Sequence, residues 1–227
     1  MKKLTKRQRK VLERLVRSGI IEEGFYLAGG TALTLKYNHR GSRDFDFFSE
    51  SFFKNSPLHY LNILQRGGDL KIEMLKADTL IFFLQDVRCS FFLYPYKLIR
   101  PLEKIKISIS DEEKNNEYVA VASDEDIAGM KAVAIVQRGT KKDFYDLWFL
   151  MKTYNWNLTD VKKICKTKYG ALFPESAFER AIVYFDDAEK ESFSEIDPFW
   201  EEIKQFFVNV VKHPVSSKLK IKKELLN

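Results

Sequence analysis

Two hydrophobic patterns divide the chain near residue 122, and this division constrains the fold more than any other feature of the sequence. The runs that read as strands cover 25–28, 44–48, three stretches between 70 and 94, and 118–121. The helical patterns cover 4–19, 31–37 and 57–66 before the division, and 124–138, 141–153, 159–168, 174–188 and 197–211 after it. We therefore predict an α/β (α+β) half, 1–122, with a mixed sheet flanked by helices, and a helical half, 123–227.

A pair of glycines, Gly29 and Gly30, separates the first strand-like run from the helix after it. Glycines at such a place let the backbone approach a ligand closely, and the free amides of a helix N-terminus favour anionic oxygens. Thr31 adds a hydroxyl, either as a helix cap or as a phosphate contact. A lone Gly-Gly is more often an ordinary turn, so the pair gains weight only from the acidic residues that come next in the chain.

Two carboxylates, Asp44 and Asp46, flank Phe45 soon after that helix. On a strand they point to one face while Phe45 points to the other. Two like charges held together are costly unless a cation neutralises them, and a pair of oxygen ligands suits Mg²⁺ or Mn²⁺. The two segments together predict nucleotide chemistry on a divalent metal.

The helical half carries a second group of charged residues. A helix that starts at Ser123 places Lys131 and Arg138 on one face, and the next helix carries Asp143 and Asp146. From spacing alone, a surface charge network between two packed helices is as good an interpretation as a functional site.

These two segments resemble the motifs of one known family. Residues 29–48 resemble the first motif of the AbiEii/AbiGii-type nucleotidyltransferase toxins, a branch of the DNA polymerase beta-like nucleotidyltransferase superfamily, with Gly30-Thr31 where Gly-Ser is common. Residues 131–147 are similar to the family pattern K-x(6)-R-x(3)-KDxxDL. Both motifs occur in the expected order.

The resemblance implies an enzyme that transfers NMP from an NTP to an acceptor and releases pyrophosphate. It implies a nucleotidyltransferase-type sheet, Mg²⁺ or Mn²⁺ on Asp44 and Asp46, Lys131 on the triphosphate, and Asp143 completing a site in the cleft between the halves. The nucleotide-binding candidates are Gly29, Gly30, Thr31, Arg40, Ser42, Arg43, Arg138 and Asp146.

One departure from the superfamily concerns a third metal-binding carboxylate, which many members carry on a later central strand. The corresponding stretch here, 87–94, contains no acid. Glu73 is an alternative ligand, although a single Glu on an alternating strand more often faces solvent. Either Asp143 substitutes for the third acid, or metal binding rests on Asp44 and Asp46.

The net charge of +6 is concentrated at the two ends of the chain, in residues 2–17 and 212–223. Lysine and arginine supply sequence-independent affinity for phosphate backbones, although lysines at chain ends are commonly just exposed to solvent and bind nothing. With the family resemblance, this favours an RNA acceptor, and tRNA in particular. The same resemblance implies the toxin of a bacterial type IV toxin–antitoxin or abortive-infection pair, whose antitoxin need not bind it directly.

The remaining composition narrows the classes of protein. No apolar run approaches the roughly 20 residues that span a bilayer, so we expect a cytoplasmic protein with no membrane partner. Two cysteines, Cys89 and Cys165, give no disulfide framework, and three histidines offer no zinc spacing. Two other functions stay open: a protein AMPylase-like transferase, and a non-catalytic nucleotide- or RNA-binding module.

Overall fold

The computed structural model describes residues 4–66, 68–107 and 117–213. Its described strands form one mixed sheet in the order β3-β4-β5-β2-β1-β7-β6. Their bounds are β1 Tyr26–Leu27, β2 Phe45–Ser49, β3 Leu70–Leu75, β4 Thr79–Leu84, β5 Val87–Leu93, β6 Glu103–Lys106 and β7 Tyr118–Val121. The helices of this half are α1 Lys6–Arg17, α2 Gly29–Tyr37 and α3 Pro57–Gln65, with a 3-10 turn, η1, at Ile20–Glu23.

Two parallel pairings make the sheet mixed. The central strand β2 runs parallel to β5 and antiparallel to β1, and β1 runs parallel to β7. The other neighbours, β3 with β4, β4 with β5, and β6 with β7, are antiparallel. The tight turn between β4 and β5 places Gln85 and Asp86 at positive φ, as a two-residue hairpin requires.

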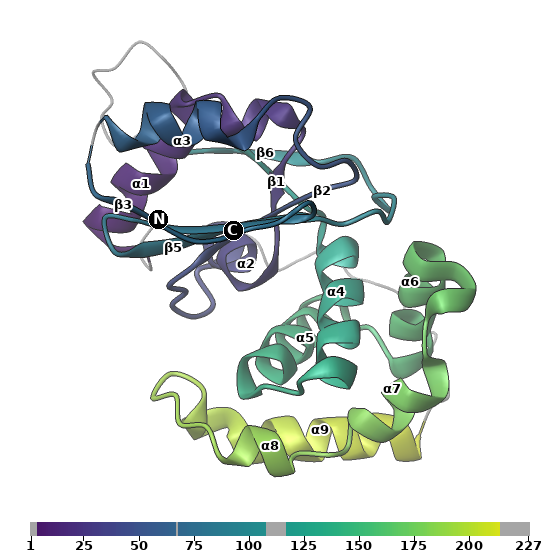
Figure 1. Cartoon of the computed structure of the whole chain (residues 1–227). Coiled ribbons are helices and arrows are strands. Elements are labelled where there is room, and N and C mark those ends of the chain that lie inside the picture. The colour runs from purple at the N-terminus through teal and green to yellow at the C-terminus, as the bar shows by residue number, and fades with distance from the viewer. Residues whose placement is uncertain (1–3, 67, 108–116, 214–227) are drawn as a thin grey trace.

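Alternation along β2 and β5 gives the sheet two unlike faces. Phe45, Phe47 and Phe91 are fully buried, and the rings of Phe47 and Phe91 stack at 4.8 Å. Helices α1 and α3 lie over this face, whereas α2 and the helical half lie on the other side of the sheet (Figure 1). Each buried phenylalanine contributes about 1.5–3 kcal/mol of transfer free energy. The opposite face presents Asp46, Phe48 and the polar side chains of β5.

The helical half consists of α4 Asp124–Gln137, α5 Lys141–Tyr154, α6 Leu158–Tyr169, η2 Gly170–Leu172, α7 Glu175–Ala181, α8 Asp186–Glu189, η3 Asp197–Phe199 and α9 Trp200–Lys212. Helix α4 begins where the sequence predicts, because the Ser123 hydroxyl accepts a hydrogen bond from the Asp126 amide at 3.0 Å. Helices α4 and α5 pack together below the sheet (Figure 1).

Three boundaries differ from the sequence prediction. The single helix expected over 174–188 is two short helices, because the linking stretch from Ile182 to Phe185 is β-branched and aromatic and favours helix only weakly. Strand β6 was not predicted, since Glu103–Lys106 is a short, mostly exposed edge strand with charged side chains. Helix α2 begins at Gly29 and so includes both glycines.

No helix within 4–66, 68–107 or 117–213 is both long and apolar enough to cross a membrane. Some of the basic residues that the sequence singled out at the two ends lie outside the described residues, namely Lys2, Lys3 and the lysines from Lys218 to Lys223. The others lie mainly in α1 and at the end of α9.

Candidate active site

The carboxylates of Asp44 and Asp46 lie at the start of β2. Phe45 between them is fully buried, whereas Asp44 is exposed and Asp46 is partly buried, so the two acids share the face of the sheet opposite the aromatic core. The backbone of Asp46 is held against the end of β1, because its carbonyl accepts the Ala28 amide at 3.2 Å. This contact brings the acids beside the first residues of α2.

The two glycines at the start of α2 are required for different reasons. Gly29 has a φ of +68°, which an L side chain rarely adopts, and no atom lies within 4 Å of the position of an added Cβ. At Gly30 an added Cβ would lie 2.3 Å from Nη2 of Arg40. Gly29 is therefore an open, left-handed position, whereas Gly30 makes room for a buried arginine.

The loop between α2 and β2 is fixed by polar contacts on both sides. The hydroxyl of Thr31 lies 2.6 Å from the Ser42 hydroxyl and donates to the Asp44 carbonyl. The Gln8 side chain on α1 donates to the carbonyls of Ser42 at 2.7 Å and Arg43 at 3.1 Å. Thr31 and Ser42 thus hold the backbone that carries Asp44, while the Arg43 side chain is exposed.

Arg40 joins this loop to α5 through a bidentate ion pair. Its Nε and Nη2 lie 2.7 and 2.6 Å from the two carboxylate oxygens of Asp146, which is fully buried. Lys131 on α4 reaches the same carboxylate, with Nζ 2.8 Å from Oδ2. One contact between the halves is therefore a buried group of charges.

His39 completes the surroundings of Asp146. Its Nε2 lies 2.8 Å from Asp146 Oδ1, and its side chain is fully buried. Burial lowers the pKa of His39 despite the neighbouring carboxylate. The imidazole is therefore neutral and donates its Nε2–H to Asp146, while Nδ1 has no hydrogen-bond partner among the described residues.

Asp143 is also surrounded by donors. Lys131 Nζ lies 2.9 Å from Oδ1, and the guanidinium of Arg138 spans both oxygens at 2.8 and 3.0 Å. The Thr140 hydroxyl donates to Oδ2 at 2.6 Å. Although burial alone would raise it, these cations and hydrogen bonds hold the pKa of Asp143 well below its usual range.

Lys131 is the common partner of both α5 carboxylates. Burial alone would lower its pKa, but Asp143 and Asp146 raise it, so the ammonium stays charged. The charge network that spacing alone suggested is present, although it is buried and not on the surface. In the surroundings of Asp143, only the Arg138 side chain is largely exposed, at 62%.

Ser90 is a residue of the site that the sequence did not indicate. The parallel register of β2 and β5 places Ser90 directly beside Asp46, on the strand where a third carboxylate was sought. Burial and the Asp44 charge raise the pKa of Asp46, whereas a hydrogen bond from Ser90 and the charges of Arg88 and Lys131 oppose the rise.

Arg88 ties Ser90 to the outer strand. Its Nη1 donates to the Ser90 hydroxyl at 3.2 Å, and its Nε donates to Glu73 on β3 at 3.2 Å. Glu73 is therefore paired with an arginine, and strands β4 and β5 lie between its strand and β2. Only strand register connects these residues, so no local sequence signal predicts the arrangement.

The carboxylates differ in how well they fit a divalent metal. Among the described residues no group of three or more His, Cys, Asp or Glu side chains could enclose an ion, and neither Asp44 nor Asp46 forms an ion pair there. Mg²⁺ commonly binds one or two carboxylates and completes its sphere with substrate phosphates and water. Asp44 and Asp46 fit that requirement, whereas the oxygens of Asp143 and Asp146 already bind cations and donors of the protein.

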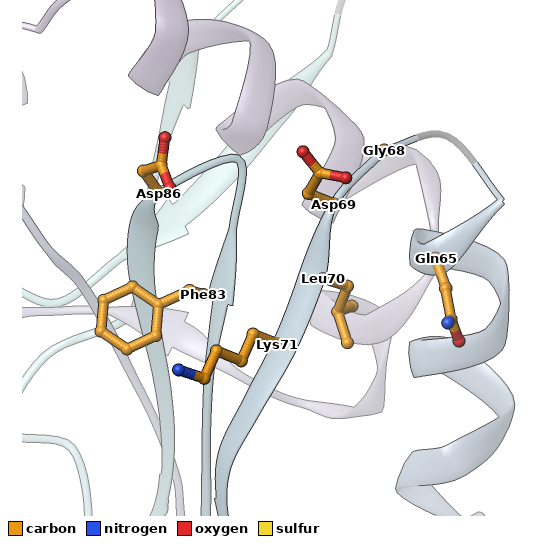
Figure 2. A pocket seen from close by; sticks show the side chains of 7 residues that line it. All are labelled: Gln65, Gly68, Asp69, Leu70, Lys71, Phe83 and Asp86. Atoms are coloured by element: carbon orange, nitrogen blue, oxygen red, sulfur yellow. The ribbon is translucent and has the colours of Figure 1, made fainter.

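A separate hollow of about 710 Å³ lies at the outer edge of the sheet. Figure 2 shows Lys71 and Phe83 on adjacent strands, with Asp69 and Asp86 above them and Gln65 beside them on α3. Strand β5 separates these strands from β2. None of the predicted site residues lines this hollow.

Comparison with known proteins places this arrangement in a family. The family model for the nucleotidyl transferase AbiEii toxin of type IV toxin–antitoxin systems matches residues 10–202. An uncharacterized protein of Aquifex aeolicus (strain VF5) is 45% identical over 216 residues, which cover 93% of this chain and 98% of that protein. The nucleotidyltransferase toxin MenT4 of Mycobacterium tuberculosis H37Rv shares the fold, with a TM-score of 0.56 and 13% identity over 90% of this chain and 83% of that one. The chain belongs to the AbiEii nucleotidyltransferase toxin family.

Proposed function

We propose that this protein transfers a nucleoside monophosphate from an NTP to an RNA acceptor, with tRNA as the first candidate, in a reaction that depends on Mg²⁺ or Mn²⁺. The observation that carries the proposal is the pair of Asp44 and Asp46 carboxylates, which lie beside the start of α2 and within the electrostatic reach of Lys131. The biological setting is growth arrest or abortive infection opposed by an antitoxin that need not bind the toxin.

The chain's own residues divide the work of transfer. The acceptor hydroxyl oxygen forms a bond to the α-phosphorus, the bond from that phosphorus to the β-phosphate oxygen breaks, pyrophosphate leaves, and the hydroxyl proton passes to water. Gly29 and the first amides of α2 bind the anionic oxygens of the leaving group. Asp44 and Asp46 would hold the divalent metal, which neutralises phosphate charge and orients the α-phosphate when bound.

The cations and carboxylates of the helical half serve this site in two ways. Lys131 and Arg138 provide positive potential toward the triphosphate, and Arg138 is the more accessible of the two. Asp143 and Asp146 hold Lys131, Arg138 and Arg40 in position. Asp143 thus completes the site as an anchor for cations, and Thr31 and Ser42 keep the Asp44 backbone in place.

The decisive experiment incubates the protein with each α-³²P-labelled NTP, Mg²⁺ and either total tRNA or lysate protein. We expect label on RNA, with pyrophosphate released in equal amount and both signals lost in Asp44→Asn. If the label appears on protein instead, the acceptor is a protein and the proposal of an RNA acceptor is wrong. Nucleotide binding without pyrophosphate release on any acceptor would refute the enzymatic proposal and leave a binding module.

A further inference from the structure

An aromatic pair continues the row of site residues along the same face of the sheet. Phe48 follows Asp46 by two residues on β2, and Phe92 follows Ser90 by two residues on β5. The parallel register pairs Phe48 with Phe92, and their ring centroids are 5.5 Å apart. Since a strand rises about 3.3 Å per residue, this aromatic shelf begins about 7 Å from the Asp46–Ser90 pair.

The shelf differs from the aromatic core on the opposite face. Phe47 and Phe91, the neighbours of Phe48 and Phe92 in the chain, are completely buried, whereas both shelf residues are only partly buried. A partly exposed aromatic pair beside a polar site is a typical surface for stacking a nucleic-acid base.

One end of the shelf is closed by the helical half. The ring of Tyr94 packs edge-on against Phe48 at 5.4 Å, and its hydroxyl lies 2.6 Å from the Tyr169 hydroxyl on α6. Lys168, next to Tyr169, places Nζ 5.5 Å above the Tyr94 ring. On the β4 side, Phe92 instead faces Thr79, a small side chain. The shelf is therefore bounded by aromatic side chains toward α6 and by a small side chain toward the outer strands.

The geometry of in-line transfer assigns the shelf to one of the two substrates. Gly29 and the start of α2 lie on the β1 flank of the acids, where the leaving pyrophosphate is placed by the proposed function. The attacking oxygen must approach the α-phosphorus from the side opposite the leaving group. That flank is β5, with Ser90 and Phe92. The nucleoside on this side is therefore that of the acceptor and not that of the NTP.

We propose that Phe48 and Phe92 stack the terminal base of a nucleic-acid acceptor and thereby bring its ribose hydroxyl to the Asp44–Asp46 site. This inference rests on the proposed function and adds the position at which the acceptor binds. Stacking on an aromatic ring tolerates every base, so the shelf selects a nucleic-acid end without reading its sequence.

The test separates the acceptor from the NTP by steady-state kinetics. Phe92→Leu keeps an apolar side chain but removes the stacking ring. We expect KM for tRNA to rise about 5- to 150-fold, the range that corresponds to the loss of one base–aromatic contact, with KM for the NTP unchanged. Phe92→Tyr should restore the acceptor KM, and Tyr184→Leu, at a 54% exposed aromatic residue in the helical half, should leave both KM values unchanged.

A second measurement does not depend on turnover. An oligoribonucleotide with 4-thiouridine at its 3′ end, irradiated with the wild-type protein, should crosslink to peptides that contain Phe48 or residues 87–94. Transfer to tRNA by the wild type, together with an unchanged acceptor KM in Phe92→Leu or crosslinks only elsewhere, would overturn the shelf and leave the proposed function standing. A wild type that labels no RNA would instead overturn the proposed function.

Discussion

The candidate site contains two closely spaced pairs of carboxylates, and their surroundings are opposite. Asp44 and Asp46 form no ion pair among the described residues, and burial raises the pKa of Asp46. Asp143 and Asp146 are fully buried, and their oxygens bind lysine, arginine and histidine side chains. The negative charge of the first pair is not balanced by a cation in direct contact among the described residues, whereas that of the second pair is. Under the proposed function, the same residue type would bind a metal in one half, whereas it fixes protein cations in the other.

The largest difference between the pairs should appear in activity. Asp46→Asn removes one of the two proposed ligands for the metal, and we expect nucleotide transfer to fall by about 1,000-fold, since several kcal/mol of charge stabilisation would be lost. The folded state should not be destabilised, because the raised pKa of Asp46 means that its charge costs stability when ionised. Urea unfolding and transfer assays test both points, with exposed Asp69→Asn as the control.

The opposite result is expected for the helical pair. Asp146→Asn leaves Arg40 and Lys131 buried with less compensation, so the free energy of unfolding should fall by about 3–5 kcal/mol. Urea unfolding measures this loss, and Asp187→Asn, in an exposed pair with Lys190, should change little. If Asp146→Asn were as stable as the wild type while Asp46→Asn unfolded, the distinction between the pairs would be lost.

Substitutions at the two glycines should have intermediate effects on stability, and they test whether Gly30 supports the Arg40–Asp146 pair. Gly30→Ala should cost about 1–3 kcal/mol of stability, because the new Cβ displaces Arg40 from Asp146. Most of this cost should vanish in an Arg40→Ala background, which a double-mutant cycle measures. Gly29→Ala should show no such coupling to Arg40, since its cost of about 1–2 kcal/mol comes from positive φ. Equal coupling at both glycines would contradict the separate roles.

The smallest effect concerns pH. The folded-state pKa of His39 is lowered, so the unfolded chain takes up a proton first as the pH falls through about 6.5. Stability should decrease below that pH, by at most about 1.4 kcal/mol per pH unit from this group. His39→Gln should flatten the decrease between pH 7.5 and 5.5 in urea unfolding. Because the pKa values of Asp143 and Asp146 are lowered, the stability that their carboxylates contribute is lost only in a more acidic range, below about pH 4. A wild-type slope retained in His39→Gln would contradict the assignment.

The sequence by itself determined the kinds of elements and most of their positions. Periodicity separated the sheet from the helices, and Phe45 between two acids predicted a strand with one buried face, as β2 has. The family motifs identified the nucleotidyltransferase family, which the family model confirms. These features depend on neighbours in the chain, so local patterns are sufficient to reveal them.

Only the tertiary structure decided which distant side chains meet. Ser90 stands beside Asp46 because β2 and β5 pair in a particular parallel register, and the same register forms the aromatic shelf of Phe48 and Phe92. Arg40 reaches Asp146 across 106 residues, and Gly30 is needed for that contact rather than for its own turn. Strand register and helix packing join segments that no spacing rule connects. In the sheet, a shift of one residue in the pairing would place Ser90 and Phe92 on the wrong face.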